Sequence, residues 1–326
     1  MTQWRIFRGT AEPHDGFDRL PPPVDWRSFD GTPIDEPELP WRRQDERRAR
    51  AFVPDEETLD VVNAALYLRR PLLVTGSPGV GKSTLALAIA RELGLGPMLR
   101  WPITSRSTLK EGLYTYDAIG RLHDVNLHEQ QARSDIGRYL TLGPLGTALL
   151  PRRRPRVLLV DEIDKSDIDL PNDLLHIFEE GEFTIPELRR MAAEQPRVEV
   201  TTAEGTHRVP VEGGVVRCHA FPVVVLTSNQ ERDFPAAFLR RCLQLTIAAP
   251  GRDRLRQIVR ARLGLDMERQ AGDLIDTFVE RQRSGELAID QLLNAIFLRF
   301  KATERPDDGM DALAGKLMEP LGSVTD

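Results

Sequence analysis

Cysteine, aromatic residues and long apolar runs are all scarce in this chain of 326 residues. Its two cysteines, Cys218 and Cys242, are too few for a disulfide framework or a four-ligand zinc site, so we expect two reduced thiols. No run approaches the roughly 20 apolar residues that a membrane-spanning helix needs. The N-terminal residues lack the apolar stretch and small-residue cleavage site of a secretory signal. These absences predict a cytoplasmic protein without a membrane partner.

The chain also lacks an excess of basic over acidic residues. Lys and Arg number 44 against 50 Asp and Glu, the net charge is −6, and aromatic residues make up only 6%. Binding nucleic acid generally calls for a positive surface and aromatic platforms for the bases, so the composition argues against a nucleic-acid partner. We interpret the basic run PRRRPR at 151–156 as a loop at a subunit surface. His123 and His128 are five apart, which is not a metal-binding spacing on a helix.

The first 50 residues differ in composition from the rest. Residues 1–50 are rich in Pro, Asp and Gly and have no sustained apolar period, which predicts an arm or linker. We expect its isolated tryptophans to pack onto their own domain: Trp4, Trp26 and Trp41.

From residue 51 the pattern becomes regular. Three continuous apolar runs lie at 70–76, 156–162 and 221–229, and continuous rather than alternating runs indicate strands covered on both faces. Helical patterns occupy 54–70 and 82–96. This predicts an α/β core at 51–250, in which helices sandwich a parallel sheet. The helical periodicity that follows predicts a small α-helical lid domain and tail at 251–326.

The strongest motif is GSPGVGKS, which fits the phosphate-loop pattern G-x-x-x-x-G-K-[ST] in full and lies between an apolar strand and an apolar-periodic helix. Glycines let backbone N–H groups approach phosphate oxygens, and the helix start presents its positive dipole end. We expect Lys82 to reach the β- and γ-phosphates of ATP and the Ser83 hydroxyl to ligate Mg²⁺. The predicted nucleotide-binding residues are Gly76, Ser77, Pro78, Gly79, Val80, Gly81, Lys82, Ser83 and Thr84.

Acidic residues end the second apolar strand. Asp161 is placed to hold Mg²⁺, directly or through water, and Glu162 to polarise the attacking water. Asn229 follows the third apolar run and is placed to sense the γ-phosphate or hold that water, because the ends of parallel strands line the ligand crevice. Arg240 and Arg241 are either a solvated helix end or an arginine finger that meets a neighbouring subunit's γ-phosphate.

These motifs in this order resemble an AAA+ ATPase, and more narrowly the MoxR-type ATPases. The resemblance is carried by GSPGVGKS, VLLVDEID and TSNQERDFPAAFLRRC, by the helical tail, and by Ile136-Gly137-Arg138 with the segment that follows at 141–188. It covers about residues 52–250 well and the tail loosely. It identifies Lys82 and Ser83 as Walker A, Asp161 and Glu162 as Walker B, and Asn229 as sensor 1.

The resemblance also implies a hexameric ring with ATP at the subunit interfaces, and Arg241 as the finger, with Arg240 as the alternative. The lid departs from the family: Glu286-Leu287-Ala288-Ile289-Asp290 stands where a basic sensor 2 residue is usual, and Arg281, Arg283 or Arg299 is the available substitute.

Two further segments of the core resemble family inserts. Residues 109–124 would face the ring axis, so that Tyr114 or Tyr116 touches a client, or would form a surface hairpin with packed tyrosines. Residues 198–221 alternate apolar and polar side chains around two glycine turns, which predicts a β-hairpin.

The resemblance implies an ATP hydrolase with ATP and Mg²⁺ as cofactors, which remodels a protein client as a homo-oligomer, with a von Willebrand A domain protein as partner. One alternative is an assembly switch gated by ATP, in which hydrolysis is incidental. The other is a DNA-acting motor, against which the acidic charge and few aromatics count.

Overall fold

The computed structural model describes residues 4–35, 37–127, 135–205, 207–282, 287–301 and 308–318. A five-stranded sheet, in the order β11-β1-β10-β5-β2, forms its centre, and every neighbouring pair is parallel. The order places β10 between the strand that precedes the phosphate loop and the strand that ends in the acidic pair. The strands are β1 (Leu72–Thr75), β2 (Leu99–Pro102), β5 (Val157–Asp161), β10 (Val223–Ser228) and β11 (Leu243–Thr246).

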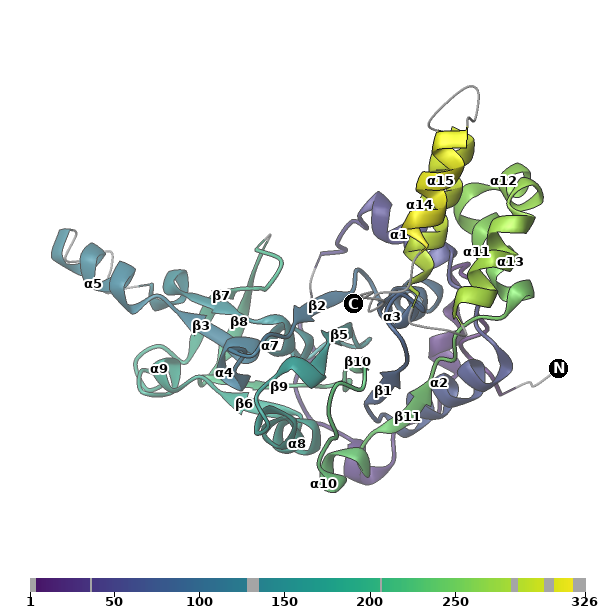
Figure 1. Ribbon diagram of the computed structural model, residues 1–326. Coiled ribbons are helices and arrows are strands. Elements are labelled where there is room, and N and C mark those ends of the chain that lie inside the picture. Colours follow the sequence, from purple (N-terminus) through teal and green to yellow (C-terminus); the bar gives the residue numbers. More distant parts are fainter. Residues whose placement is uncertain are drawn as a thin grey trace.

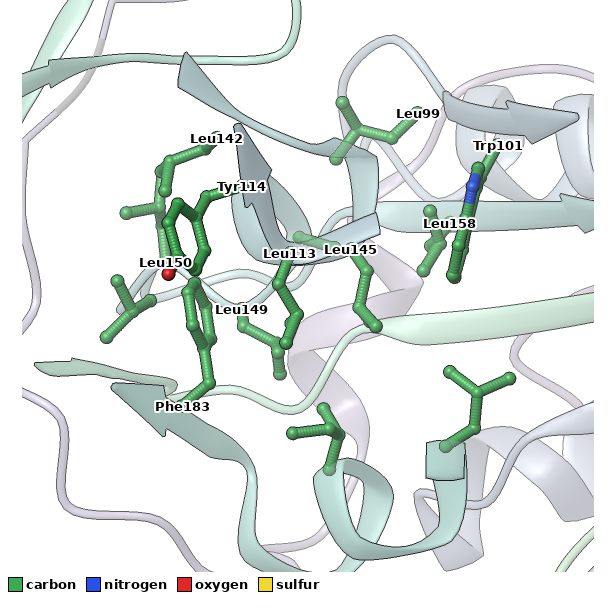
Figure 2. Packing of buried hydrophobic residues seen from close by; sticks show 14 of the residues in the cluster. Leu99, Trp101, Leu113, Tyr114, Leu142, Leu145, Leu149, Leu150, Leu158 and Phe183 are labelled. Carbon is green, nitrogen blue, oxygen red and sulfur yellow. The ribbon is translucent and has the colours of Figure 1, made fainter. Parts of the chain in front are cut away.

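Successive side chains of these strands enter two separate cores, which is why their sequences read as continuous apolar runs. Val74 and Leu159 pack with α2 (Glu56–Leu68) and α3 (Lys82–Glu92) on one face. On the other face, Leu73, Leu158 and Val160 belong to a cluster with α7 (Pro144–Ala148), α8 (Leu170–Glu180) and α10 (Ala236–Leu239), part of which is seen in Figure 2. The predicted parallel sheet between helices is confirmed.

A second sheet, which the sequence predicted only in part, extends the core away from the lid (Figure 1). Its order is β3-β4-β7-β8-β9-β6, and only the β4–β7 pair is parallel. The predicted hairpin at 198–221 is present as β7 and β8, and β9 continues it. The strands are β3 (Tyr114–Tyr116), β4 (Leu140–Leu142), β6 (Glu182–Thr184), β7 (Arg197–Thr201), β8 (Arg208–Glu212) and β9 (Val215–Arg217).

The segment from residue 109 to 127 forms α4 (Leu109–Leu113), β3 and α5 (Ala118–Leu127), and α5 projects from the molecule (Figure 1). Tyr114 is buried: its ring stacks on Phe183, and its hydroxyl donates to Glu187 at 2.9 Å. Figure 2 shows the two rings lying against each other. The interpretation of Tyr114 as a client contact is therefore wrong, because packing removes the ring from solvent. Tyr116 is half-buried.

Five helices form the described part of the lid. The short helix α9 (Pro186–Arg189) lies outside the lid, in the core. Leu255, Ile275, Phe278 and Leu292 pack into a hydrophobic core of the lid's own. The predicted α-helical lid is confirmed, and its helices rise beside α3 in Figure 1. They are α11 (Arg252–Leu263), α12 (Leu265–Gln270), α13 (Gly272–Gln282), α14 (Ile289–Lys301) and α15 (Asp308–Leu317).

The described residues of the N-terminal segment form no helix or strand apart from η1 (Asp15–Arg19), η2 (Asp25–Arg27) and α1 (Arg43–Arg50). It begins inside the core, because Ile6 and Phe7 are buried with α2 and α3. The proposed boundaries after residues 50 and 250 stay predictions.

The three tryptophans of this segment differ in burial. Trp4 contacts Tyr67 and Trp41 packs on the core, as expected. Trp26 does not, because it is 76% exposed.

Cys218 and Cys242 are free and buried, and burial raises the pKa of each thiol to about 12. Within the described ranges, no helix combines the length and apolar character needed to span a bilayer.

Candidate active site

The phosphate loop connects β1 to α3 at the carboxyl edge of the central sheet. Gly79 and Gly81 have φ of +80° and +99°, a backbone conformation that side chains other than glycine rarely adopt. A Cβ on Gly79 would lie 2.9 Å from the Cβ of Ala288, so the lid approaches the tip of the loop. The spacing of glycines in the motif is thus explained by backbone shape and by close contact with the lid.

Lys82 is buried and ties the loop to the end of β10. Its ammonium donates to the carbonyl oxygens of Gly76 at 2.6 Å and Ser77 at 3.0 Å, and to Oδ1 of Asn229 at 2.7 Å. Two predicted residues separated by 147 positions therefore meet, and an ammonium group stands where the loop cradles phosphate.

Ser83 and Asp161, the two predicted magnesium ligands, are also in contact. The Ser83 hydroxyl donates to Oδ1 of Asp161 at 2.7 Å, and Oδ2 of the same carboxylate accepts from Arg100 at 2.8 Å. Mg²⁺ prefers hard oxygen donors and usually takes only one or two from the protein, the rest coming from water and phosphate. The hydroxyl and carboxylate fit that donor set. Within the described residues, no cluster of three or more His, Cys, Asp or Glu forms a metal cage.

Glu162 follows Asp161 in a left-handed conformation, with φ of +61°. This rare conformation for a non-glycine residue turns the side chain from the strand direction toward the cavity rim. Its side chain is 43% exposed, and its carboxylate accepts a hydrogen bond from Lys165 at 2.8 Å. The hydrogen bond to Glu162 raises the pKa of Lys165 above its ordinary value. Glu162 is thus an accessible carboxylate at the end of the acidic strand.

Thr227, which the sequence analysis missed, joins the two acidic residues to β10. Its buried hydroxyl donates to Oδ1 of Asp161 at 2.8 Å and accepts from the backbone N–H of Glu162 at 2.9 Å. The only signal in the sequence is a hydroxyl near the end of an otherwise apolar strand.

Asp164 anchors the chain after β10. This buried carboxylate accepts at Oδ2 from the backbone N–H groups of Asn229, at 2.8 Å, and Glu231, at 3.2 Å. Asp164 therefore holds the predicted sensor, Asn229, in place at the end of β10.

A cavity of about 760 Å³ brings these groups together. Its walls come from α1 and the residues after it, the phosphate loop, the ends of β5 and β10, and the lid helices α11 and α14. Of the predicted residues, it is lined by Pro78, Gly79, Val80, Gly81, Lys82, Ser83, Thr84, Asp161, Glu162 and Asn229.

Neither Arg240 nor Arg241 lines this cavity. Arg240 is exposed, while Arg241 forms an ion pair with Glu179 of α8 and donates to the carbonyl of Ala237 at 3.3 Å. The arginine pair therefore does not serve the nucleotide site of its own chain in this structure, and the finger role stays a prediction.

The residues considered as lid substitutes also lie elsewhere. Arg281 donates to the carbonyl oxygens of Gly315 at 2.6 Å and Met318 at 3.2 Å, and Arg299 pairs with Asp273 at 2.5 Å. Neither lines the cavity. Arg283, Glu286 and His128 lie outside the described residues.

The strand order, phosphate loop and acidic strand end define a P-loop nucleotide hydrolase. Residues 71–242 match the family model of the AAA domain, dynein-related subfamily. Because the match covers just over half of the chain, the chain belongs to this family and is an ATP hydrolase that binds nucleotide.

Among solved structures, the chain is similar to the crystal structure of domain III from the Thermotoga maritima replication initiation protein DnaA. The sequence identity is 14% and the TM-score 0.42, over 86% of this chain and 100% of that chain. The chain has no match among curated proteins.

Proposed function

We propose that this chain is a MoxR-type ATPase that uses Mg²⁺ and ATP and assembles into a ring to remodel a protein client. The supporting observation is the division of the catalytic groups. Lys82, Ser83, Asp161, Glu162 and Asn229 share one cavity, whereas the arginine pair lies outside it. A second subunit that presents Arg241 or Arg240 would complete the site.

Each group of the cavity has a chemical role in this proposal. Lys82 binds the β- and γ-phosphates, and Ser83 and Asp161 hold magnesium. Magnesium, when bound, neutralises phosphate charge and stabilises the leaving diphosphate. Glu162 accepts a hydrogen bond from the attacking water and so orients the water oxygen toward the γ-phosphorus. As the new P–O bond forms, the bond to the β-phosphate oxygen breaks, and the water proton passes to Glu162.

Ring assembly and a protein client are proposed on the resemblance at 141–188 and on the presence of the expected β7–β8 hairpin. The second sheet and α5 extend the core on the side away from the lid (Figure 1), and we propose this part of the molecule as the binding site for a client or a von Willebrand A domain partner. The acidic net charge of −6 supports a protein client over a nucleic acid.

The particle mass of the Glu162→Gln variant in the presence of ATP tests whether the chain assembles into a ring. Removal of the base should leave nucleotide binding intact, so we expect mass photometry to find particles of about six times the 36.8 kDa chain mass. Lys82→Ala, the matched control, should remain smaller because it lacks the phosphate contact. Particles of single-chain mass for Glu162→Gln in saturating ATP would reject the ring.

Client remodelling is tested with assembled wild-type protein. Turnover should rise when a client binds, because a motor couples hydrolysis to its substrate. An ATP-gated switch instead predicts that assembly follows nucleotide state while turnover is the same with and without a client.

A further inference from the structure

Five arginines line the nucleotide cavity from elements that carry none of the recognised motifs, and four of them have guanidinium groups without a partner among the described residues. Three are on α1, an N-terminal helix that packs against α3, and the fourth is on lid helix α11. Both helices lie outside residues 71–242, which match the family model. The four residues are Arg47, Arg48, Arg50 and Arg262.

These four guanidinium groups differ from the fifth arginine of the same walls in having no hydrogen bond or ion pair to a described residue. Arg254, also on α11, shows the contrast: it donates to Asp55 Oδ2 at 2.8 Å and to the carbonyl of Val53 at 2.9 Å. Guanidinium groups bind carboxylate and phosphate in pairs of parallel hydrogen bonds, so groups without such partners among the described residues have donors to offer to a ligand.

Arg48 and Arg262 are close enough to affect each other. Burial lowers the pKa of Arg262, the charge of Asp290 opposes this, and the positive charge of Arg48 lowers the pKa further. Two cations from separate elements on the walls of one cavity repel each other, and an anion bound between them removes the repulsion. The phosphate loop opens into the same cavity, so a nucleotide brings that anion there.

We propose that Arg48 and Arg262 bind phosphate oxygens of the bound nucleotide from two sides, so that the ligand joins the N-terminal helix α1 to the lid helix α11. This clamp rests on the proposed occupation of the cavity by ATP. It assigns a ligand-binding role to α1, which the sequence analysis treated as part of a linker, and it supplies the lid with a phosphate contact at a position outside residues 286–290.

Nucleotide binding to the full chain tests the clamp. Loss of hydrogen bonds to a charged group typically costs tenfold or more in affinity, so Arg48→Ala and Arg262→Ala should each raise the Kd for ATP and for ADP about tenfold. The Kd for adenosine, which has no phosphate, should not change. Because the two side chains share one ligand, the double variant should lose less than the product of the single losses.

Exposed arginines on the same helices provide matched controls. Arg43→Ala on α1 and Arg260→Ala on α11 remove the same charge without touching the cavity, so both should bind ATP as wild type does. Arg262→Lys should recover part of the affinity, because it keeps the charge but not the paired donors.

Three results would overturn the clamp. These are unchanged ATP affinity in both single variants, an equal loss for adenosine, and a loss seen only where subunits assemble, which would place the arginines at a subunit contact. The Lys82→Ala variant distinguishes failure of the clamp from failure of the proposed function. If that variant retains full ATP affinity, the nucleotide is not in this cavity at all.

Discussion

A single buried hydroxyl connects the parts of the site that handle metal and water. Thr227 bonds to the Asp161 carboxylate and to the backbone of Glu162, although it belongs to β10 and they belong to the end of β5. It therefore fixes the positions of Asp161 and Glu162 relative to the central sheet. A hydrogen bond of this kind holds catalytic groups in the geometry that the reaction needs.

Thr227→Val should keep the shape of the side chain and remove the hydroxyl. The buried N–H of Glu162 then loses its acceptor, so we expect a loss of about 1–3 kcal/mol in the free energy of unfolding. A misplaced carboxylate should also lower kcat about tenfold while KM for ATP changes little. Urea unfolding and steady-state ATPase assays measure both effects.

Thr227→Ser is the matched control and should preserve most of the wild-type kcat, because it keeps the donor and acceptor. Wild-type turnover by Thr227→Val would contradict the assigned role.

The site residues that the sequence predicted share a local signature. Lys82 and Ser83 lie in a motif with fixed spacing, while Asp161 and Asn229 lie at the ends of apolar strands. Because the carboxyl ends of parallel strands meet at one edge of the sheet, the sequence predicted that these residues lie close together. Arg48 and Arg262 carry no such signature. Their approach depends on how α1 and the lid pack around the cavity, which no pattern within either helix records.

The N-terminal segment is the element whose structure departs most from its composition. Asn63 of α2 holds it in place: Oδ1 accepts from the backbone N–H groups of Ile6 at 2.6 Å and Phe7 at 2.9 Å, and Nδ2 donates to the Phe7 carbonyl at 2.7 Å. Glu92 of α3 accepts from the N–H of Ala11 at 3.1 Å. Two buried side chains thus replace the strand pairing that this segment lacks.

Asn63→Ala should lower the free energy of unfolding by about 2–4 kcal/mol, since it leaves several buried backbone groups without partners. Tyr67→Phe is the control from the same helix: it removes a single hydrogen bond to the Trp4 carbonyl, and that bond is exposed. Its expected cost is about 1 kcal/mol or less. Equal losses in the two variants would contradict the anchoring role of Asn63.

An ion pair at the start of β8 gives a pH dependence with a definite sign. The hydrogen bond from Arg208 of β8 to Asp135 lowers the pKa of that carboxyl below its ordinary value. The pair therefore stabilises the fold above the unfolded-state pKa near 4, and this contribution disappears as pH falls through the folded-state pKa.

Asp135→Asn should be less stable than wild type at pH 7 by about 1 kcal/mol or less, because both side chains are more than a third exposed, at 37% each. At a second pH below the folded-state pKa of Asp135 the difference should shrink toward zero. Urea unfolding at the two pH values measures it, and a difference that does not depend on pH would show that the ion pair is not its cause.

At the scale of elements, length decided what the sequence could predict. The continuous apolar runs of β1, β5 and β10 and the periodic lid helices show their pattern, whereas the four-residue strands β2 and β11 have exposed side chains between buried or half-buried ones and were not predicted. β3, β4, β6 and β9 have three residues each, too few to establish a period. They exist because neighbouring strands pair with them, and Leu140 and Leu142 of β4 are buried only through that pairing and the cluster around it.

The whole molecule has its nucleotide cavity between the core, α1 and the lid, and its arginine pair outside that cavity. In the proposed ring, this arrangement would leave each site to be completed by an arginine of another chain. The ion pair between Arg241 and Glu179 holds the arginine beside α8 in the single chain.

Mixtures of two inactive variants test this exchange between subunits. Glu162→Gln lacks the base but keeps the arginine, and Arg241→Ala lacks the arginine but keeps the base. Mixed rings contain interfaces with both groups intact, so the mixture should hydrolyse ATP faster than the sum of the two variants assayed alone. Arg240→Ala in place of Arg241→Ala shows which arginine acts. A mixture whose rate equals the sum would place the arginine outside catalysis.

The central claim is that ATP with magnesium lies on the phosphate loop, with its γ-phosphate facing Glu162. Its most direct test is to measure, in one preparation, the retention and the turnover of labelled ATP by Glu162→Gln. The account predicts retention equal to that of wild type, dependent on magnesium and lost in Lys82→Ala, together with a turnover rate reduced at least a hundredfold (about 3 kcal/mol). Turnover at the wild-type rate, or retention that does not depend on Lys82, would contradict it.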